Sequence, residues 1–172
     1  MHAAREQGAA ASVETRLARL EACEAIRACV YAYAVAGDRG NRTEILREVF
    51  TDNGVYEAAG MGRFEGLPAI LTGLAEIANN VVLWSFHAPG GPLIRLGDDG
   101  KRATVFWWVW CPVVLRSPDG ATTPHWGAGH YNGELADERG RWKFTRLFFE
   151  TRLRTPFAGP WSVVDNPFQW PL

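Results

Sequence analysis

The sequence predicts a single domain of the α+β class, in which helices come first and strands follow. Apolar residues recur at helical spacing in several stretches of the first 80 residues. Beyond them, β-branched and aromatic runs are separated by turn sequences rich in Gly, Pro and Asp. Strands and helices do not alternate along the chain, so a doubly wound α/β fold is not expected. With 172 residues, the chain can bury one substantial core and is short for two.

Three helices are expected in the first half of the chain. Residues 13–37 carry apolar side chains at helical spacing, and Gly37 is a typical helix stop. Asn41, with a glutamate three residues later, predicts the N-cap of a short second helix that ends near Phe50. Residues 67–80 predict a third helix with a proline in its first turn. The apolar positions assigned to the first helix are Leu17, Leu20, Ile26, Val30 and Tyr33 or Ala34.

Strands are expected between and after these helices. Residues 51–66 predict a hairpin with its turn at 52–54 or 59–60. The later strand-like segments are 81–96, which "APGGP" interrupts, 103–115, 121–135 and 141–154. We expect residues 1–12 to be a flexible leader and residues 13–172 to form the domain. Its aromatic, proline-rich tail, 155–172, is expected to pack over a pocket mouth or onto a neighbouring subunit.

Composition excludes several classes of function. The formal net charge is −1, so neither nucleic acid nor an acidic membrane is an expected partner. The first twelve residues lack the apolar segment of a signal peptide, and the three cysteines lack the pairing of a disulfide framework, which predicts a reduced, cytoplasmic protein. Eight tryptophans and nine phenylalanines exceed what a core of this size needs. They predict an aromatic pocket or a subunit interface.

Asp38 is the first candidate for chemistry. It follows the predicted end of the first helix, where the helix dipole disfavours a negative charge and makes a carboxylate more basic. Tyr31 and Tyr33 precede it and could donate hydrogen bonds to an oxyanion. The alternative is that Asp38 is an exposed turn residue and the tyrosines belong to the core. The sequence by itself leaves both interpretations open.

Two histidines are the next candidates. His87 lies among apolar and aromatic residues, where it either forms a hydrogen bond within the core or takes part in proton transfer. His130 alternates with Asn132 and Glu134 on the polar side of a predicted strand, and we expect it to be a polar contact inside a cavity. The spacing of His125, His130 and Glu134 matches no standard ligand set, so neither a metal nor another cofactor is expected.

The order of these motifs resembles the SnoaL-like branch of the NTF2-like superfamily. The resemblance spans residues 17–159 and rests on the spacing of Tyr33 and Asp38, on "LREVFTDNGVYE", on "GRFEG" and on "GHYNGELADERGRWKF". "ANNVVLW", His87 and "TPFAG" are similar to the hexachlorocyclohexane dehydrochlorinase members in particular. The resemblance implies a cone-shaped α+β barrel. In it a strongly curved, mostly antiparallel sheet surrounds a cavity that the first helix closes.

The resemblance also implies roles for individual residues. Eliminating members of the family use a buried His–Asp pair at the positions of His87 and Asp38, and an assisting Tyr or Lys at the position of Tyr33. Arg146, Arg152 and Arg154 lie near the position of a catalytic arginine of the dehydrochlorinase, but none matches it. Residues expected to bind substrate are Tyr31, Tyr56, Trp84, Trp108, Trp110, Trp126 and His130.

Together these observations predict a cofactor-independent lyase that removes water, halide or a small carbonyl from a hydrophobic, aromatic or polycyclic molecule. An isomerase with the same pair of residues is one alternative, and a non-catalytic small-molecule-binding module is another. The run "TVFWWVWCPVVL" presents rings on both faces of its predicted strand. Because one of those faces needs cover, we expect a homo-oligomer, either a trimer or a dimer.

Overall fold

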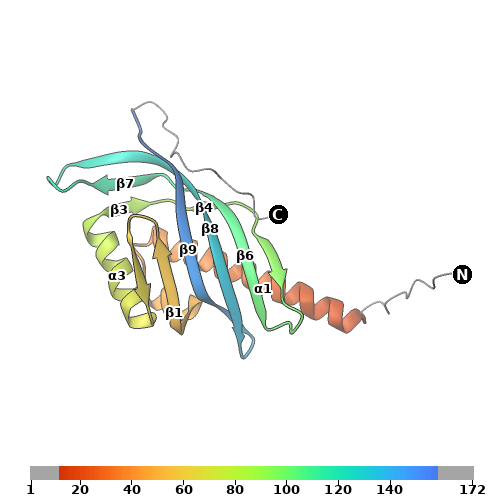
Figure 1. Cartoon of the computed structure of the whole chain (residues 1–172). Coiled ribbons are helices and arrows are strands. Elements are labelled where there is room, and N and C mark those ends of the chain that lie inside the picture. The colour runs from red at the N-terminus through yellow and green to blue at the C-terminus, as the bar shows by residue number, and fades with distance from the viewer. Residues whose placement is uncertain (1–11, 159–172) are drawn as a thin grey trace, which may run out of the picture.

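The computed structural model describes residues 12–158 and has the predicted α+β architecture, with three helices packed on one mixed, mostly antiparallel sheet (Figure 1). The helices are α1 (Val13–Asp38), α2 (Thr43–Val49) and α3 (Leu67–Asn80). The strands are β1 (Phe50–Ala58), β2 (Gly62–Glu65), β3 (Val82–Ser85), β4 (Ala88–Pro89), β5 (Leu93–Leu96), β6 (Arg102–Trp110), β7 (Val113–Arg116), β8 (Thr122–Glu138) and β9 (Arg141–Pro156).

The sheet is strongly curved and does not close into a complete barrel. Its main path runs β2-β1-β9-β8-β6-β4, while β5 also pairs with β6, and β7 joins β8 to β3. β1 and β9 run parallel, and the other described pairs are antiparallel. The long strands β8 and β9 cross the whole molecule, and α1 and α3 cover one side of the curve (Figure 1). The arrangement leaves a space between helices and sheet that the site occupies.

Helix α1 has two unlike halves. Ser12 caps it, accepting a hydrogen bond from the backbone N–H of Thr15 at 3.2 Å. The first half projects beyond the sheet (Figure 1), and its apolar residues, which the helical spacing had assigned to the core, are exposed, Leu17 at 53% and Leu20 at 68%. In the second half, one face of the helix is buried, beginning with Ile26. Helical periodicity predicted the helix, but whether a neighbouring element covers its apolar face depends on the fold.

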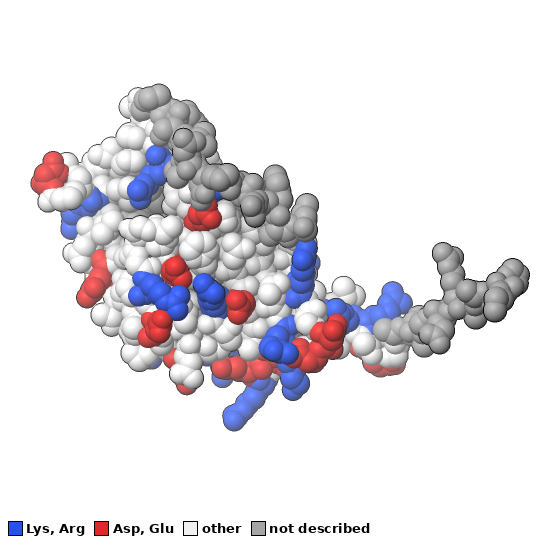
Figure 2. Space-filling model, viewed as in Figure 1, with Lys and Arg blue, Asp and Glu red and all other residues white. Residues whose placement is uncertain are grey.

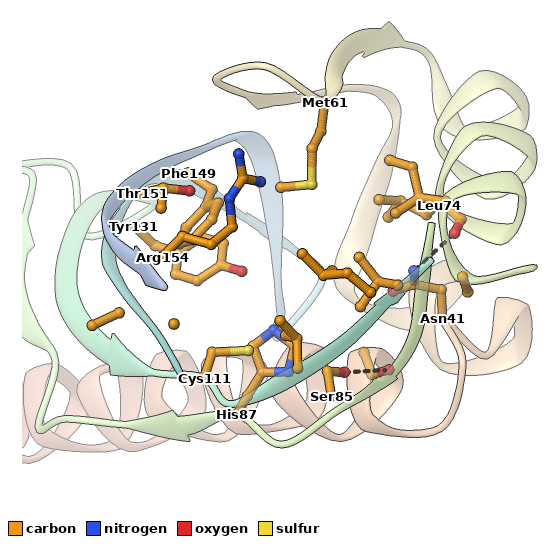
Figure 3. A pocket seen from close by; sticks show the side chains of 18 of the residues that line it. Asn41, Met61, Leu74, Ser85, His87, Cys111, Tyr131, Phe149, Thr151 and Arg154 are labelled. Carbon is orange, nitrogen blue, oxygen red and sulfur yellow. Dashed lines mark hydrogen bonds between the residues drawn. The ribbon is translucent and has the colours of Figure 1, made fainter. Parts of the chain in front are cut away.

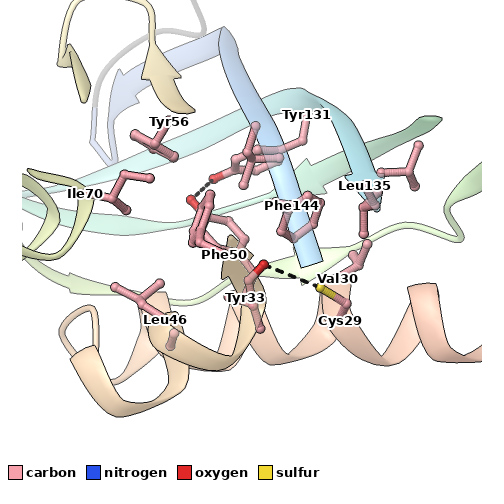
Figure 4. Packing of buried hydrophobic residues seen from close by; sticks show 14 of the residues in the cluster. Cys29, Val30, Tyr33, Leu46, Phe50, Tyr56, Ile70, Tyr131, Leu135 and Phe144 are labelled. Atoms are coloured by element: carbon pink, nitrogen blue, oxygen red, sulfur yellow. Dashed lines mark hydrogen bonds between the residues drawn. The ribbon is translucent and has the colours of Figure 1, made fainter. Parts of the chain in front are cut away.

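The core lies between the second half of α1 and the inner face of the sheet (Figure 4). Tyr33 packs edge-on against Phe50, Tyr131 and Phe144, with ring centroids 5.4–6.2 Å apart. Such edge-to-face contacts add about 0.5–1.5 kcal/mol each beyond the burial of apolar area. They hold the last turns of α1 against β8 and β9. The end of α1 is thereby placed over the space beneath the sheet.

The α1–α2 connection differs from the prediction. Helix α2 is capped by Arg42, whose side chain forms no capping hydrogen bond, and not by Asn41. Asn41 instead has a left-handed backbone, with φ 57°, and its amide donates to the carbonyl of Leu74 on α3 at 2.8 Å. Asparagine tolerates this conformation better than most residues. The polar side chain joins two helices because the tertiary structure offers it an acceptor.

Two strand predictions are resolved by the structure. The β1–β2 turn lies at residues 59–61, while residues 52–54 belong to β1 itself. The expected single strand over 103–115 is two strands, because Cys111 and Pro112 interrupt it. Proline has no N–H to donate to a neighbouring strand, so the ladder breaks there. The predicted leader and most of the predicted tail lie outside the described residues.

Candidate active site

Asp38 and His87 meet at the C-terminal end of α1. Asp38 is the last residue of the helix, and His87 lies in the short break between β3 and β4. Asp38 Oδ1 accepts a hydrogen bond from the ring Nδ1 of His87 at 2.7 Å and another from its backbone N–H at 2.8 Å. Because a carboxylate can only accept, the Nδ1 atom carries the proton and Nε2 remains for chemistry.

A third residue supports the pair from β3. Ser85 is 7% exposed, and its hydroxyl donates to the carbonyl of Gly37 at 3.3 Å, with Asp38 Oδ1 at 3.5 Å. This carbonyl belongs to the last turn of α1, where backbone acceptors have no partner within the helix. Ser85 therefore ties the helix end to the strand that leads into His87.

Gly37 leaves room for the imidazole. A Cβ atom added at this position would lie 2.8 Å from His87 Cε1, closer than real Cβ contacts. The sequence predicted Gly37 as the end of the helix, but Gly37 lies one residue inside it. Its missing side chain leaves room for the imidazole of His87. Any side chain here would push the ring away from the cavity wall.

The environment of His87 makes it a strong base. Burial lowers the pKa of the imidazole, but the hydrogen bonds of the ring with Asp38 and Cys111 and the negative charge of Asp38 outweigh burial and raise the pKa to about 9. The side chains remain largely covered, with 14% of His87 and 25% of Asp38 exposed. The surroundings of His87 thus stabilise its imidazolium form. A histidine with a stabilised imidazolium is a stronger base, which suits the removal of a proton from a weakly acidic substrate.

His87 lines a cavity of about 110 Å³ between α1, α3 and the sheet (Figure 3), and Asp38 contacts its imidazole without lining the cavity itself. Most of its lining is apolar. The residues that line it are Tyr33, Gly37, Asn41, Tyr56, Met61, Leu74, Ile77, Ala78, Val82, Ser85, His87, Cys111, Val113, Leu115, Gly127, Ala128, Tyr131, Phe149, Thr151, Leu153 and Arg154. Such a lining excludes water and favours a hydrophobic ligand.

Three buried phenols form the inner end of the cavity. The hydroxyls of Tyr33 and Tyr131 lie 3.5 Å apart (Figure 4), and Tyr56 packs beside Tyr33 with ring centroids 6.4 Å apart. Burial raises the pKa of Tyr56 to about 12 and the pKa values of Tyr33 and Tyr131 well above that of a free phenol. All three therefore stay protonated and can donate hydrogen bonds to a substrate oxygen.

The structure brings together four of the predicted site residues. His87 and Asp38 form a pair, and Tyr33 and Tyr56 line the same cavity as His87. The other six predicted contacts lie elsewhere and do not line the cavity: Tyr31, Trp84, Trp108, Trp110, Trp126 and His130. Tyr31, Trp84 and Trp108 are 47%, 53% and 39% exposed.

Strand alternation explains why these aromatic residues miss the cavity. On β6 the side chains of Val105, Trp107 and Val109 are buried in the core, so Trp108 and Trp110 face the opposite side of the sheet. On β8 the phenol of Tyr131 faces inward, which turns His130 outward against Phe106 and Trp108. Composition predicted an aromatic site, but it could not tell the two faces of a strand apart.

Sequence reasoning missed several residues of the cavity wall. Cys111 forms a hydrogen bond with His87 and lies beside the imidazole in Figure 3. The sequence favoured His130 as a cavity residue, and Tyr131 beside it was not predicted. Consecutive residues of a strand point to opposite faces, so only one of the two can face inward. Thr151 and Arg154 were not assigned to a pocket, because the face of β9 that they occupy depends on an irregularity in the strand.

Taken together, these side chains can perform acid–base chemistry. They provide a base with an orienting carboxylate, neutral phenol donors and a largely apolar cavity. Among the described residues, no group of three His, Cys, Asp or Glu side chains is arranged to hold a metal ion. No helix within residues 12–158 combines the length and hydrophobicity of a membrane-spanning segment.

Comparison with known proteins places the chain in a family. The model of the SnoaL-like domain matches residues 18–147, so the protein belongs to the SnoaL-like family, which has the NTF2-like fold. A comparison with curated protein sequences finds no match.

Solved structures with the same fold include two types of enzyme. A hexachlorocyclohexane dehydrochlorinase (LinA) type 2 superposes with a TM-score of 0.71 at 20% identity, over 88% of this chain and 98% of that one. A putative scytalone dehydratase from Novosphingobium aromaticivorans gives a TM-score of 0.68 at 18% identity, over 92% of this chain and all of that one. At such identities the comparison establishes the fold, and the function has to be argued from the site.

Proposed function

We propose that the protein is a cofactor-independent lyase that acts on a hydrophobic, aromatic small molecule. The observation that carries this proposal is that His87 lines a largely apolar cavity and is hydrogen-bonded to Asp38 at 2.7 Å. The named activities of the dehydrochlorinase and the scytalone dehydratase with the same fold, both eliminations, agree with this class of reaction.

The reaction begins with proton transfer to His87. Nε2 takes a proton from a substrate carbon, the electron pair of the C–H bond forms the new double bond, and the bond to the leaving group breaks. Asp38 accepts the hydrogen bond of the imidazolium and keeps its ring in place. Tyr33 and Tyr131 donate to a substrate oxygen on which negative charge develops. A halide departs as the anion, and a hydroxyl group departs as water with the proton that the imidazolium returns to it. For the loss of a small carbonyl, Nε2 instead takes the proton of a substrate hydroxyl, the C–C bond breaks as the new C=O bond forms, and its electron pair stays on the remaining fragment.

The raised pKa of His87 sets a condition on this step. Only the neutral imidazole can accept the proton, and with a pKa of about 9 the neutral fraction of free enzyme at pH 7 is about one in a hundred. We therefore expect kcat/KM to rise with pH and to level off above about pH 9. A profile that falls over this range would instead indicate that His87 donates a proton in the slow step.

The direct test is product analysis on a panel of aromatic alcohols and halides. A lyase releases a product lighter than its substrate by the mass of water or of hydrogen halide. An isomerase using the same pair gives a product of equal mass, and in deuterated water it incorporates deuterium. Binding without turnover of any panel member would favour a small-molecule-binding module. A wild-type activity that persists fully in His87→Gln would contradict the proposed role of His87.

A further inference from the structure

Arg154 is an exposed arginine near the end of β9 that lines the cavity next to an irregularity in the strand. The register between β8 and β9 pairs Gly129 with Thr151 and Ala128 with Leu153, so Arg152 is an extra residue in β9. Thr151 before the extra residue and both Leu153 and Arg154 after it line the cavity, with Leu153 buried and Arg154 exposed. Arg152 pairs with Glu150 at 3.0 Å, whereas Arg154, two residues further on, lines the cavity.

Glycines on β8 provide the space for this part of the wall. Arg154 is the register partner of Gly127, and Thr151 is the partner of Gly129. A Cβ atom at Gly127 would lie 2.4 Å from the carbonyl oxygen of Cys111, and one at Gly129 would lie 2.2 Å from that of Glu150. Side chains are therefore excluded at both positions across from Thr151 and Arg154. Thr151 and Arg154 both line the cavity beside these glycines.

The charge of Arg154 is not balanced within the described part of the chain. No Asp or Glu carboxylate among residues 12–158 lies within ion-pair distance of its guanidinium. Figure 3 shows the guanidinium beside Met61, across the open space from His87, with the Thr151 hydroxyl nearby. The carboxylate of Asp38 is engaged by His87 at 2.7 Å. An arginine at the rim of an apolar cavity offers a planar set of donors to an incoming ligand.

We propose that Arg154, with Thr151, is a carboxylate-binding subsite, so that the ligand of this cavity is an aromatic monoanion. The single guanidinium balances one negative charge, which fits a carboxylate better than a phosphate dianion. The apolar middle of the cavity takes the ring, and the end of the ligand away from Arg154 reaches His87. The position of this second end rests on the proposed function, whereas the carboxylate subsite does not.

A pair of matched probes tests the subsite without turnover. 4-Ethylbenzoate and 4-ethylbenzamide have nearly the same size and shape but differ in charge. Isothermal titration of the full chain at pH 7 should give a Kd for the benzoate about tenfold or more below that of the benzamide. Arg154→Met should remove this preference and leave benzamide binding unchanged. Arg154→Lys should keep part of it, because lysine retains the charge and loses the planar fork.

Two further variants make the outcome unambiguous. Arg152→Met removes the neighbouring arginine outside the cavity and should keep the preference for the benzoate. His87→Gln should keep it as well, so a failure of the lyase proposal does not affect this test. Equal binding of both probes to wild type, absence of benzoate binding up to millimolar concentration, or a preference that survives Arg154→Met would each overturn the subsite. Circular dichroism of Arg154→Met establishes that the variant is folded.

Discussion

Among the described residues, two histidine–carboxylate pairs lie on opposite faces of the sheet, and they behave differently. In the inner pair, Nδ1 of His87 lies 2.7 Å from Asp38, and the pKa of the imidazole is raised to about 9. In the outer pair, Nε2 of His130 lies 3.5 Å from Glu150. Burial and the nearby charge of Arg152 lower the pKa of this imidazole, and the opposing charge of Glu150 does not compensate for them.

The difference shows that a neighbouring carboxylate does not by itself make a histidine basic. His130 is only 5% exposed, and the arginine that binds Glu150 at 3.0 Å competes for the same negative charge. His87 shares its carboxylate with no arginine in the described residues, and a direct hydrogen bond is added to the charge. The distance between imidazole and carboxylate, and whether an arginine also binds that carboxylate, decide whether the pKa of the histidine is raised or lowered. The inner pair is therefore the candidate for proton transfer.

The largest expected effect comes from removing each imidazole in turn. His87→Gln should reduce kcat/KM by about a thousandfold, since general base catalysis contributes a factor of this order. His130→Gln should change it less than about threefold, because its side chain does not line the cavity. Steady-state kinetics on the best substrate from the panel measures both. Similar losses in the two variants would mean that the inner pair has no special role.

The two pairs should also give opposite dependences of stability on pH. The pKa of His87 is raised above its unfolded value of 6.5, so its stabilising contribution is complete below pH 6.5 and is lost as pH rises toward 9. The free energy of unfolding of wild type relative to His87→Gln should fall by up to about 3 kcal/mol over this range. The pKa of His130 is lowered, so its contribution is instead lost on acidification below pH 6.5. Urea unfolding at several pH values checks both trends, and a flat difference for His87 would contradict the assignment.

A smaller effect is expected from a methyl group at Gly37. Alanine is favoured over glycine in a helix by about 1 kcal/mol, yet the added Cβ would meet His87 Cε1 at 2.8 Å. We expect Gly37→Ala to fold normally and to lower kcat/KM by about ten- to a hundredfold, because it displaces the ring. Gly91→Ala is the matched control, since no atom lies within 4 Å of a Cβ there. Wild-type kinetics in Gly37→Ala would show that the position of the ring is not critical.

The smallest expected effect is that of one phenol. Tyr33→Phe removes a hydroxyl that lies 3.5 Å from Tyr131 and faces the cavity, while its ring contacts remain. We expect kcat to fall by about tenfold, because Tyr131 can still donate to the substrate oxygen. The double variant Tyr33→Phe/Tyr131→Phe should lose more than the product of the single effects. Strict additivity would argue that the two phenols act separately.

Local sequence determined the helices and most of the strands. The periodicity of residues 67–80, with Pro68 in the first turn, predicted α3 with its observed bounds. Spacing and a family resemblance together singled out Asp38 and His87, which are 49 residues apart and yet hydrogen-bonded. Helix periodicity and turn chemistry act over a few residues, so they can be read directly from the chain.

Only the tertiary structure decided which side chains of each strand point toward the cavity. A strand has two faces with the same spacing, so the sequence could not choose Trp107 over Trp108 or Tyr131 over His130 for the interior. Next to a one-residue irregularity in β9, both Leu153 and Arg154 line the cavity, which the alternation of a regular strand does not predict. Whether an apolar or charged group is covered depends on which distant element packs against it. For that reason the kind of chemistry could be predicted from the sequence, and the walls of the pocket could not.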